Sequence, residues 1–466
     1  MEKKSEGTLL LEKLAYEKKN AFETASEEKR AKAYAFAEGY KAFLDAAKTE
    51  REAVKEATRM AQAAGFTEYR FGDALKAGDK KYFNVHNKSF AAFVVGSEDA
   101  EKEGFRLLAS HIDSPRLDIK QVPLYEDSGM AFLKTHYYGG IKKYQWTAMP
   151  LALHGVVALK NGKTVEIKVG EDPADPVFYI NDLLPHLSRD QMAQPAAKII
   201  AGEDLNLVVG GLPYPDEDVK EKIRLTVLSR LYEAYGVTEA DFLSAELSAV
   251  PAFKARDIGF DRALVGAYGH DDRVCSYPAL TALLAEPAAR TTFVVLADKE
   301  EIGSEGNTGM QSEVFIDLMR AVCKAKNADF AAVRENSKCL SADVTAGFDP
   351  NFASVFEKRN ASLVSMGTAL CKFTGAGGKS GSNDASAEYL AFVRDLFENA
   401  GVVYQMAELG KIDAGGGGTV AKYISKWNID TVDIGVPVIS MHAPYEMVSK
   451  ADLYETYLAF AAFIKA

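Results

Sequence analysis

The sequence predicts an α/β fold, in which a mostly parallel β-sheet is flanked by helices and interrupted by an inserted β-rich segment. In the second half of the chain, short apolar runs such as TTFVVLA (291–297) alternate with helix-like stretches such as EVFIDLMRAVCKA (313–325). Parallel strands are buried on both faces and therefore appear as continuous apolar runs. Between residues 120 and 253 this alternation gives way to hairpin-like patterns.

Length and composition limit the class of protein. A chain of 466 residues favours two domains or one domain with a large insertion. We expect an α/β domain made of residues 1–119 and 254–466, with residues 120–253 as the inserted domain. The net charge of −11 argues against a nucleic-acid or anionic-membrane partner, since both need a basic surface.

The predicted cellular location follows from two further observations. No apolar stretch approaches the roughly 20 residues that a membrane-spanning helix needs. The cysteines Cys275, Cys323, Cys339 and Cys371 are scattered, with no CxxC spacing. They are expected to be free thiols in a cytoplasmic protein.

The elements follow in chain order. Residues 1–65 carry apolar residues at helical spacing and predict two or three amphipathic helices. Asn161-Gly162 predicts the turn of a β-hairpin within 149–170. The remaining predicted strands are 81–97, 104–110, 263–269, 291–297, 338–342 and 432–441, and the remaining helices are 277–288, 313–325 and 384–401.

Five of the apolar runs end on a histidine, aspartate or glutamate. The residues concerned are His111 with Asp113, then His270, Asp271 and Asp272, then Glu300 with Glu301, then Asp343, and finally His442. In open α/β sheets, sites form outside the carboxyl ends of the strands. We therefore expect these side chains to converge, although each taken alone is typical of a structural histidine or a solvated acidic loop.

The chemistry of this set favours metal binding. Histidines and carboxylates without cysteine suit divalent zinc, with cobalt or manganese as alternatives. If one carboxylate bridges, the set is large enough for two ions roughly 3.5–4 Å apart with a water between them. Of the two adjacent glutamates, Glu301 is the expected ligand and Glu300 the general base that takes the proton of this water. The residues leave open whether Asp271 or Asp272 bridges.

Other polar and glycine-rich positions have weaker functional interpretations. We expect His86, His136 and His154 to be structural, and His270 to support packing. His186 is either a loop histidine or a group delivered to a neighbouring subunit. Lys379, in a glycine-rich loop, is a candidate counter-charge for an acidic substrate. Gly417 and Gly418 are candidates for lining a substrate pocket, the alternative being a flexible turn.

The motifs ASHIDSPRLD, GAYGHDDRVCSYPAL, ADKEEIGSEGNTG, SADVTAG and SMHAPYE, in this order, resemble the M18 metalloaminopeptidases. The resemblance implies that His111, Asp271 and Asp343 hold one metal ion, and that Asp271, Glu301 and His442 hold the other. It also implies that Glu300 is the base and that Asp113 orients the site. At Asp271-Asp272 the chain is more similar to the related M42 aminopeptidases than to the aspartyl aminopeptidases of the M18 family, which carry Asp-Asn there, so a preference for acidic residues is not carried over.

The resemblance implies a two-metal aminopeptidase that hydrolyses N-terminal residues from peptides. It further implies a di-metal exopeptidase type of fold, an inserted dimerisation domain and a homo-oligomer, usually a dodecamer built from dimers. The alternatives are a di-metal deacylase or carboxypeptidase on the same scaffold, or a non-catalytic shell subunit.

Overall fold

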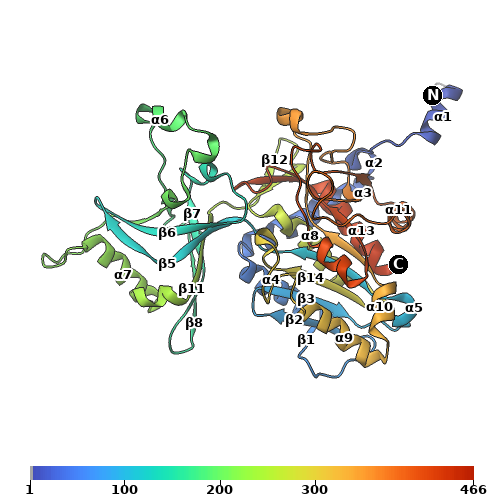
Figure 1. Cartoon of the computed structure of the whole chain (residues 1–466), viewed down its shortest axis with the longest axis horizontal. Coiled ribbons are helices and arrows are strands. Elements are labelled where there is room, and N and C mark those ends of the chain that lie inside the picture. Colours follow the sequence, from blue (N-terminus) through green and yellow to red (C-terminus); the bar gives the residue numbers. More distant parts are fainter. Residues whose placement is uncertain (1–3) are drawn as a thin grey trace.

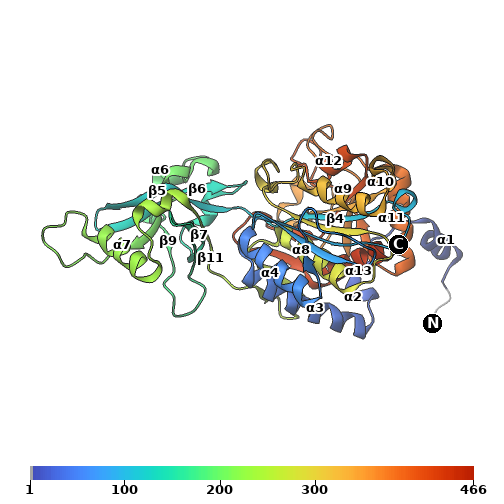
Figure 2. The ribbon, with the colours of Figure 1, turned by 90° about the horizontal axis from the view of Figure 1, so that it is seen from below.

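The computed structural model describes residues 4–466; the first three residues, which begin the predicted helical segment, lie outside the described residues. The chain folds into a larger lobe of helices around a sheet and a smaller lobe built on a second sheet (Figures 1 and 2). The C-terminus belongs to the larger lobe, and the first described helix projects from the same lobe (Figure 1). The α/β fold class is confirmed.

The N-terminal segment is helical, as its apolar spacing predicts. Its helices are α1 (Glu6–Leu14), α2 (Ala21–Thr24), α3 (Glu27–Ala46) and α4 (Glu50–Ala63). Thr49 and Glu52 form a capping box that starts α4, in which each side chain accepts a backbone N–H of the other residue. The buried face of α3 includes Tyr40, Phe43 and Leu44, which pack into the main core.

A nine-stranded sheet forms the centre of the larger lobe, in the order β1-β2-β3-β14-β4-β15-β19-β17-β18. The central strands β14, β4, β15 and β19 pair in parallel, whereas β3 joins β14 and β17 joins β19 in antiparallel fashion. The strands are β1 (Thr67–Glu68), β2 (Lys80–Val85), β3 (Ser89–Val94), β4 (Arg106–His111), β14 (Thr292–Ala297), β15 (Lys338–Ala342), β17 (Thr368–Cys371), β18 (Tyr404–Met406) and β19 (Asp430–Gly435).

Helices cover both faces of this sheet, which explains why its central strands are apolar throughout. Alternate residues of β14 belong to different cores: Val294 lies in the core that includes residues of α8 and α13, and Phe293 lies in the core that includes residues of α9. The helices of this lobe after α4 are α5 (Ala100–Glu103), α8 (His270–Ala285), α9 (Val314–Lys326), α10 (Phe330–Asn336), α11 (Ala387–Ala400), α12 (Ala421–Ile424) and α13 (Lys450–Lys465).

The smaller lobe contains a seven-stranded sheet, in the order β8-β7-β11-β5-β6-β10-β9. Its elements are β5 (Arg116–Asp127), β6 (Met130–Tyr138), β7 (Leu151–Ala158), β8 (Thr164–Val169), β9 (Tyr179–Ile180), α6 (Arg189–Met192), β10 (Leu207–Gly210), α7 (Lys222–Tyr235) and β11 (Ala245–Pro251). The predicted hairpin is confirmed: β7 and β8 are antiparallel, and Gly162 in the turn has a φ of 83°. This lobe has its own core, which includes Trp146, Leu153 and Phe242.

A third, five-stranded sheet corrects one detail of the prediction. Residues 432–441 were expected as one strand, but the chain divides them between β19 in the main sheet and β20 in the small sheet. Pro437 has no N–H to continue a central ladder, and a side chain at Gly435 would collide with the carbonyl oxygen of Asp343. The small sheet consists of β12 (Arg256–Ile258), β13 (Leu264–Ala267), β16 (Thr345–Ala346), β20 (Pro437–Ile439) and β21 (Glu446–Ser449).

Short 3₁₀ turns link these elements. They are η1 (Lys143–Trp146), η2 (Pro185–Leu187), η3 (Ala196–Lys198), η4 (Gly202–Asp204), η5 (Glu239–Ser244), η6 (Glu300–Ile302), η7 (Pro350–Val355) and η8 (Ser425–Trp427). Within residues 4–466, no helix has the length and apolar character needed to cross a membrane. All four cysteines are buried and free.

Candidate metal centre

The acidic and histidine side chains that follow the strands come together, although they belong to two sheets. His111 is the last residue of β4, Glu300 and Glu301 lie in η6 just after β14, and Asp343 follows β15. Asp271, near the start of α8, and His442 follow β13 and β20 of the small sheet. The convergence therefore needs two sheets that meet at one edge, an arrangement that the pattern of apolar runs does not specify.

Asp271 lies at the centre of the cluster. Its Oδ1 is 3.1 Å from Nε2 of His111, and its Oδ2 is 3.1 Å from Nε2 of His442. Glu301 Oε1 is 3.4 Å from the same nitrogen of His442. On the other side, Asp343 Oδ1 and Glu300 Oε2 are each 3.9 Å from Nε2 of His111. The side chains thus form two groups that share Asp271. One group adds His111, Asp343 and Glu300, and the other adds Glu301 and His442.

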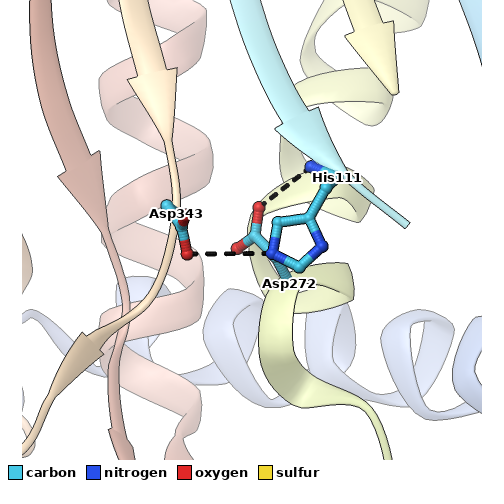
Figure 3. Close-up of side chains that lie close together, drawn as sticks. All are labelled: His111, Asp272 and Asp343. Atoms are coloured by element: carbon cyan, nitrogen blue, oxygen red, sulfur yellow. Dashed lines mark hydrogen bonds and ion pairs between the residues drawn. The ribbon is translucent and has the colours of Figure 1, made fainter. Parts of the chain in front are cut away.

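Asp272 is close to the group that contains His111, but it contacts the backbone of that histidine. Figure 3 shows its carboxylate beside His111 and Asp343, with Oδ2 accepting a hydrogen bond from the backbone N–H of His111 at 3.4 Å. Its distances would permit a role in a metal site with these two residues. However, Asp272 makes no recorded contact with His442, whereas Asp271 reaches both histidines.

The two histidines are oriented through their other ring nitrogens. Nδ1 of His442 lies 2.8 Å from the carbonyl oxygen of Gly140, and Nδ1 of His111 lies 3.1 Å from that of Asp113. A carbonyl can only accept, so Nδ1 carries the proton in both rings. Burial alone would lower the pKa of both rings, but the neighbouring carboxylates outweigh it and raise the pKa, to about 10 for His442. Once Nε2 has lost its proton, it is a lone-pair donor aimed at the carboxylates, which is the usual arrangement of metal-binding histidines.

The carboxylates of the cluster outnumber the cations that the protein offers them, since only His111 and His442 face them. No lysine or arginine among residues 4–466 forms an ion pair with Asp271, Glu300, Glu301 or Asp343. Asp271 Oδ1 and Glu301 Oε1 are buried without a geometrically acceptable hydrogen-bond donor. Burial raises the pKa of Glu300 to about 7 and also raises the pKa values of Glu301 and Asp343. Buried oxygens that lack donors fit divalent cations.

Asp113 binds the backbone of Glu300 and Glu301. The backbone N–H groups of Glu300 and Glu301 donate to its carboxylate at 3.1 and 3.2 Å. Burial alone would raise the pKa of Asp113, but the hydrogen bonds from His111 and Tyr138 outweigh it and lower the pKa. Asp113 is therefore an ionised carboxylate that fixes the backbone of η6.

Two supporting residues were not predicted from the sequence. Glu446 accepts hydrogen bonds from the backbone N–H groups of His442 at 2.7 Å and Asp271 at 3.1 Å, and burial raises its pKa to about 8. Its position four residues after His442 was an available signal. Tyr138 donates to Asp113 at 2.8 Å. This tyrosine lies in β6 of the smaller lobe, so no local pattern connects it to the site.

The four residues predicted to bind substrate make other contacts than those of the metal-ligand cluster. Lys379 forms an ion pair with Asp384 at 3.0 Å, and the carbonyl oxygen of Gly417 accepts from Gly375 N–H at 2.7 Å. Gly418 is exposed in the same loop, and His186 is exposed in η2. Among the described residues, no recorded hydrogen bond or ion pair joins any of these four to the cluster.

The other histidines lie outside the cluster. His270 is buried between the Tyr40 hydroxyl and the Val265 carbonyl oxygen, consistent with packing. His86 and His136 are exposed. His154 is not an isolated residue as its local sequence indicated: its ring nitrogens lie 2.9 Å from Glu52 and 3.1 Å from Glu171, which come from distant segments.

Known proteins resemble this chain over nearly its whole length. The family model described as aminopeptidase I zinc metalloprotease (M18) matches residues 43–464. A probable M18 family aminopeptidase 1 from Clostridium acetobutylicum is 45% identical over 460 residues, which cover 97% of this chain and 99% of that protein.

Solved structures give the same result. The crystal structure of an M18 family aminopeptidase from Thermotoga maritima has a TM-score of 0.92 and 42% identity, covering 97% of this chain and all of that one. The more distant mApe1 dodecamer from S. cerevesiae has a TM-score of 0.75 at 22% identity, covering 92% of this chain and 95% of that one. At this identity the similarity concerns the fold alone.

Proposed function

The chain belongs to the M18 family of zinc metalloaminopeptidases, and we propose that it uses two divalent ions to remove N-terminal residues from peptides. The observation that supports this best is Asp271, whose two carboxylate oxygens each lie 3.1 Å from a different histidine. A carboxylate between two histidines suits a bridge between two ions.

In this proposal each ion has its own set of ligands. His111, Asp271 and Asp343 would hold one ion, and Asp271, Glu301 and His442 would hold the other. Zinc is the expected metal because histidine nitrogen and carboxylate oxygen are its usual ligands when cysteine is absent, with cobalt or manganese as substitutes. Bound ions would polarise the scissile carbonyl and supply an activated water.

Glu300 is the proposed general base. Its side chain is 18% exposed, so it keeps access to solvent, and its Oε2 is 3.9 Å from His111 Nε2. Burial raises its pKa to about 7, and a nearby dication would lower that pKa again, so the carboxylate is ionised at neutral pH. It can take a proton from the attacking water and then pass it to the leaving amine. Asp113 holds the peptide backbone of Glu300 and Glu301 in place during this transfer.

An oligomer and a cytoplasmic location belong to the same proposal. The smaller lobe, proposed as an inserted domain, exposes many large apolar side chains, including Leu183, Leu184, Leu187, Met192 and Leu212. Such exposure favours burial against another subunit. The dodecamer of the S. cerevesiae mApe1 protein supports a homo-oligomer here as well. Four free cysteines support a cytoplasmic location.

Peptides with one blocked end test the activity. After addition of zinc, cobalt or manganese, the protein should hydrolyse a peptide with a blocked C-terminus and leave one with a blocked N-terminus intact. The opposite preference would indicate a carboxypeptidase, and release of an N-acyl group would indicate a deacylase. No turnover with two bound ions per chain would favour the non-catalytic shell subunit.

A further inference from the structure

Tyr138 joins the smaller lobe to the residues that surround the proposed metal centre. It is the last residue of β6, whose strand lies in the seven-stranded sheet. Its hydroxyl donates to Oδ2 of Asp113 at 2.8 Å. Asp113 has no solvent exposure, so water cannot replace this donor without structural change. We propose that Tyr138 is a positioning residue, which acts through Asp113 on the backbone of Glu300 and Glu301.

The hydrogen bonds to Asp113 show why one hydroxyl matters. An ionised carboxylate has about four acceptor sites. Two are used by the N–H groups of Glu300 and Glu301, and one by the Tyr138 hydroxyl. Nδ1 of His111, whose proton goes to the carbonyl oxygen of Asp113, also lies 3.3 Å from Oδ1. Three donors therefore hold the carboxylate of Asp113, and loss of one of them leaves a buried lone pair without a partner.

Tyr138 is itself held in a fixed position. The guanidinium of Arg116 lies over its ring, with the central carbon 4.1 Å from the ring centroid. Arg116 forms ion pairs with Glu50 at 2.9 Å and with Asp118 at 2.8 Å. Glu50 begins α4 of the larger lobe, whereas Asp118 belongs to β5 of the smaller lobe. The tyrosine ring is thus clamped at the boundary between the lobes.

The two residues after Tyr138 reach the second half of the cluster. The carbonyl oxygen of Gly140 accepts the Nδ1–H of His442 at 2.8 Å. A side chain at Gly139 would lie 3.2 Å from Oε2 of Glu301, and its φ of 72° also favours glycine. Residues 138–140 therefore contact both sides of the site. Tyr138 does so through its side-chain hydroxyl, and Gly140 through its backbone carbonyl oxygen.

The test is Tyr138→Phe, which keeps the ring and removes the hydroxyl. This test rests on the proposed function only for its kinetic part. We expect kcat to fall roughly 10–100-fold with KM nearly unchanged, the usual effect of removing a supporting partner near a metal. In the metal-free protein, we expect hydrogen exchange of the Glu300 and Glu301 amides to accelerate by about tenfold or more. Tyr125→Phe, in β5 of the same sheet, is the matched control and should change neither quantity.

A double mutant separates a positioning role from a general loss of stability. If Tyr138 acts through Asp113, Tyr138→Phe should add little to the loss of kcat already caused by Asp113→Asn. Additive losses, or unchanged amide exchange together with a kcat within twofold of wild type, would overturn the proposal. The two readouts test different proposals. If the wild-type protein is inactive but Tyr138→Phe still accelerates exchange of the Glu300 and Glu301 amides, the proposed function is refuted and the positioning role of Tyr138 is supported.

Discussion

The protein contains two clusters of largely buried charged side chains, and only one of them has enough protein cations to balance its carboxylates; at the strand ends, His111 and His442 alone face a larger number of carboxylates. At the junction of the lobes, His154 lies between Glu52 and Glu171, and Lys48 lies 2.6 Å from Glu171. At the strand ends, Asp271, Glu301 and Asp343 have no lysine or arginine partner in the described chain. Most side chains of both clusters are buried, so the main difference between the clusters is one of charge balance.

The pKa shifts of the carboxyl groups express this difference. At the junction, burial alone would raise the pKa of Glu171, but its histidine and lysine partners outweigh burial and lower the pKa to about 2. In the strand-end cluster, burial is outweighed by the two histidines only at Asp271, whose pKa they lower. At Glu300, Glu301 and Asp343 burial prevails and raises the pKa, to about 7 for Glu300. A buried acidic cluster that protein cations neutralise needs no further partner, whereas a cluster with a surplus of carboxylates can accept a cation from outside the protein. This contrast separates a structural cluster from a metal site.

The largest expected effect is that of Glu300→Gln. The amide is similar in shape and cannot take a proton from water, so kcat should fall by roughly 10²–10⁴ with little change in KM. Steady-state kinetics with an aminoacyl reporter substrate measure both constants. Glu305→Gln, an exposed residue of the same loop, is the control and should retain wild-type kinetics. Loss of bound metal in Glu300→Gln would mean that this residue is a ligand and not the base.

The next largest effect concerns His442→Ala. In our assignment His442 is the only imidazole available to its ion. The variant should therefore retain about one ion per chain, and it should lose the second ion and most of its activity. Metal analysis after dialysis measures the ratio. His136→Ala, at an exposed histidine of the smaller lobe, should retain both ions. Two ions and full activity in His442→Ala would remove this histidine from the ligand set.

The junction should respond to mutation in a different way. His154→Gln removes a charge that both neighbouring carboxylates use, so we expect a loss of about 1–3 kcal/mol in the free energy of unfolding, with metal content unchanged. Chemical denaturation measures this loss, with the exposed His136→Gln as control. A loss of metal without a loss of stability would make His154 part of the metal site instead.

The same variant should show a defined pH dependence. Burial alone would lower the pKa of His154, but the hydrogen bonds to Glu171 and Glu52 outweigh it and raise the pKa in the folded state. The stabilisation is therefore complete below the pKa of an unfolded histidine, about 6.5. It declines as the pH rises through the higher folded-state value. The difference in unfolding free energy between wild type and His154→Gln should be largest near pH 6 and smaller at alkaline pH.

The smallest expected effect is that of Lys379→Ala. The Lys379 ammonium is 3.0 Å from Asp384 and 3.8 Å from the centroid of the Phe373 ring, so its charge already has partners. We expect the ratio of kcat/KM for acidic and neutral N-terminal residues to change by less than about twofold, within the effect of an exposed ion pair. A selective loss of acidic substrates would restore Lys379 as the counter-charge of a substrate side chain.

The sequence contained the fold class and the residues of the cluster but not their three-dimensional connection. Apolar runs that end on His111, Glu301 and Asp343 follow directly from parallel strands buried on both faces. By contrast, the division of residues 432–441 between two sheets depends on the packing of Gly435 against Asp343. The role of Tyr138 and the acidic partners of His154 could not be predicted either, because these contacts join different lobes or distant segments.

The central claim is that the unbalanced cluster binds two divalent ions, one of them through Glu301. Metal-to-protein ratios measured by mass spectrometry on wild type, Glu300→Gln and Glu301→Gln test it most directly. We predict two ions per chain in wild type and in Glu300→Gln, and about one in Glu301→Gln, because an amide oxygen is a poorer ligand than a carboxylate. Equal ratios in all three proteins, or a loss of metal in Glu300→Gln alone, would contradict the claim.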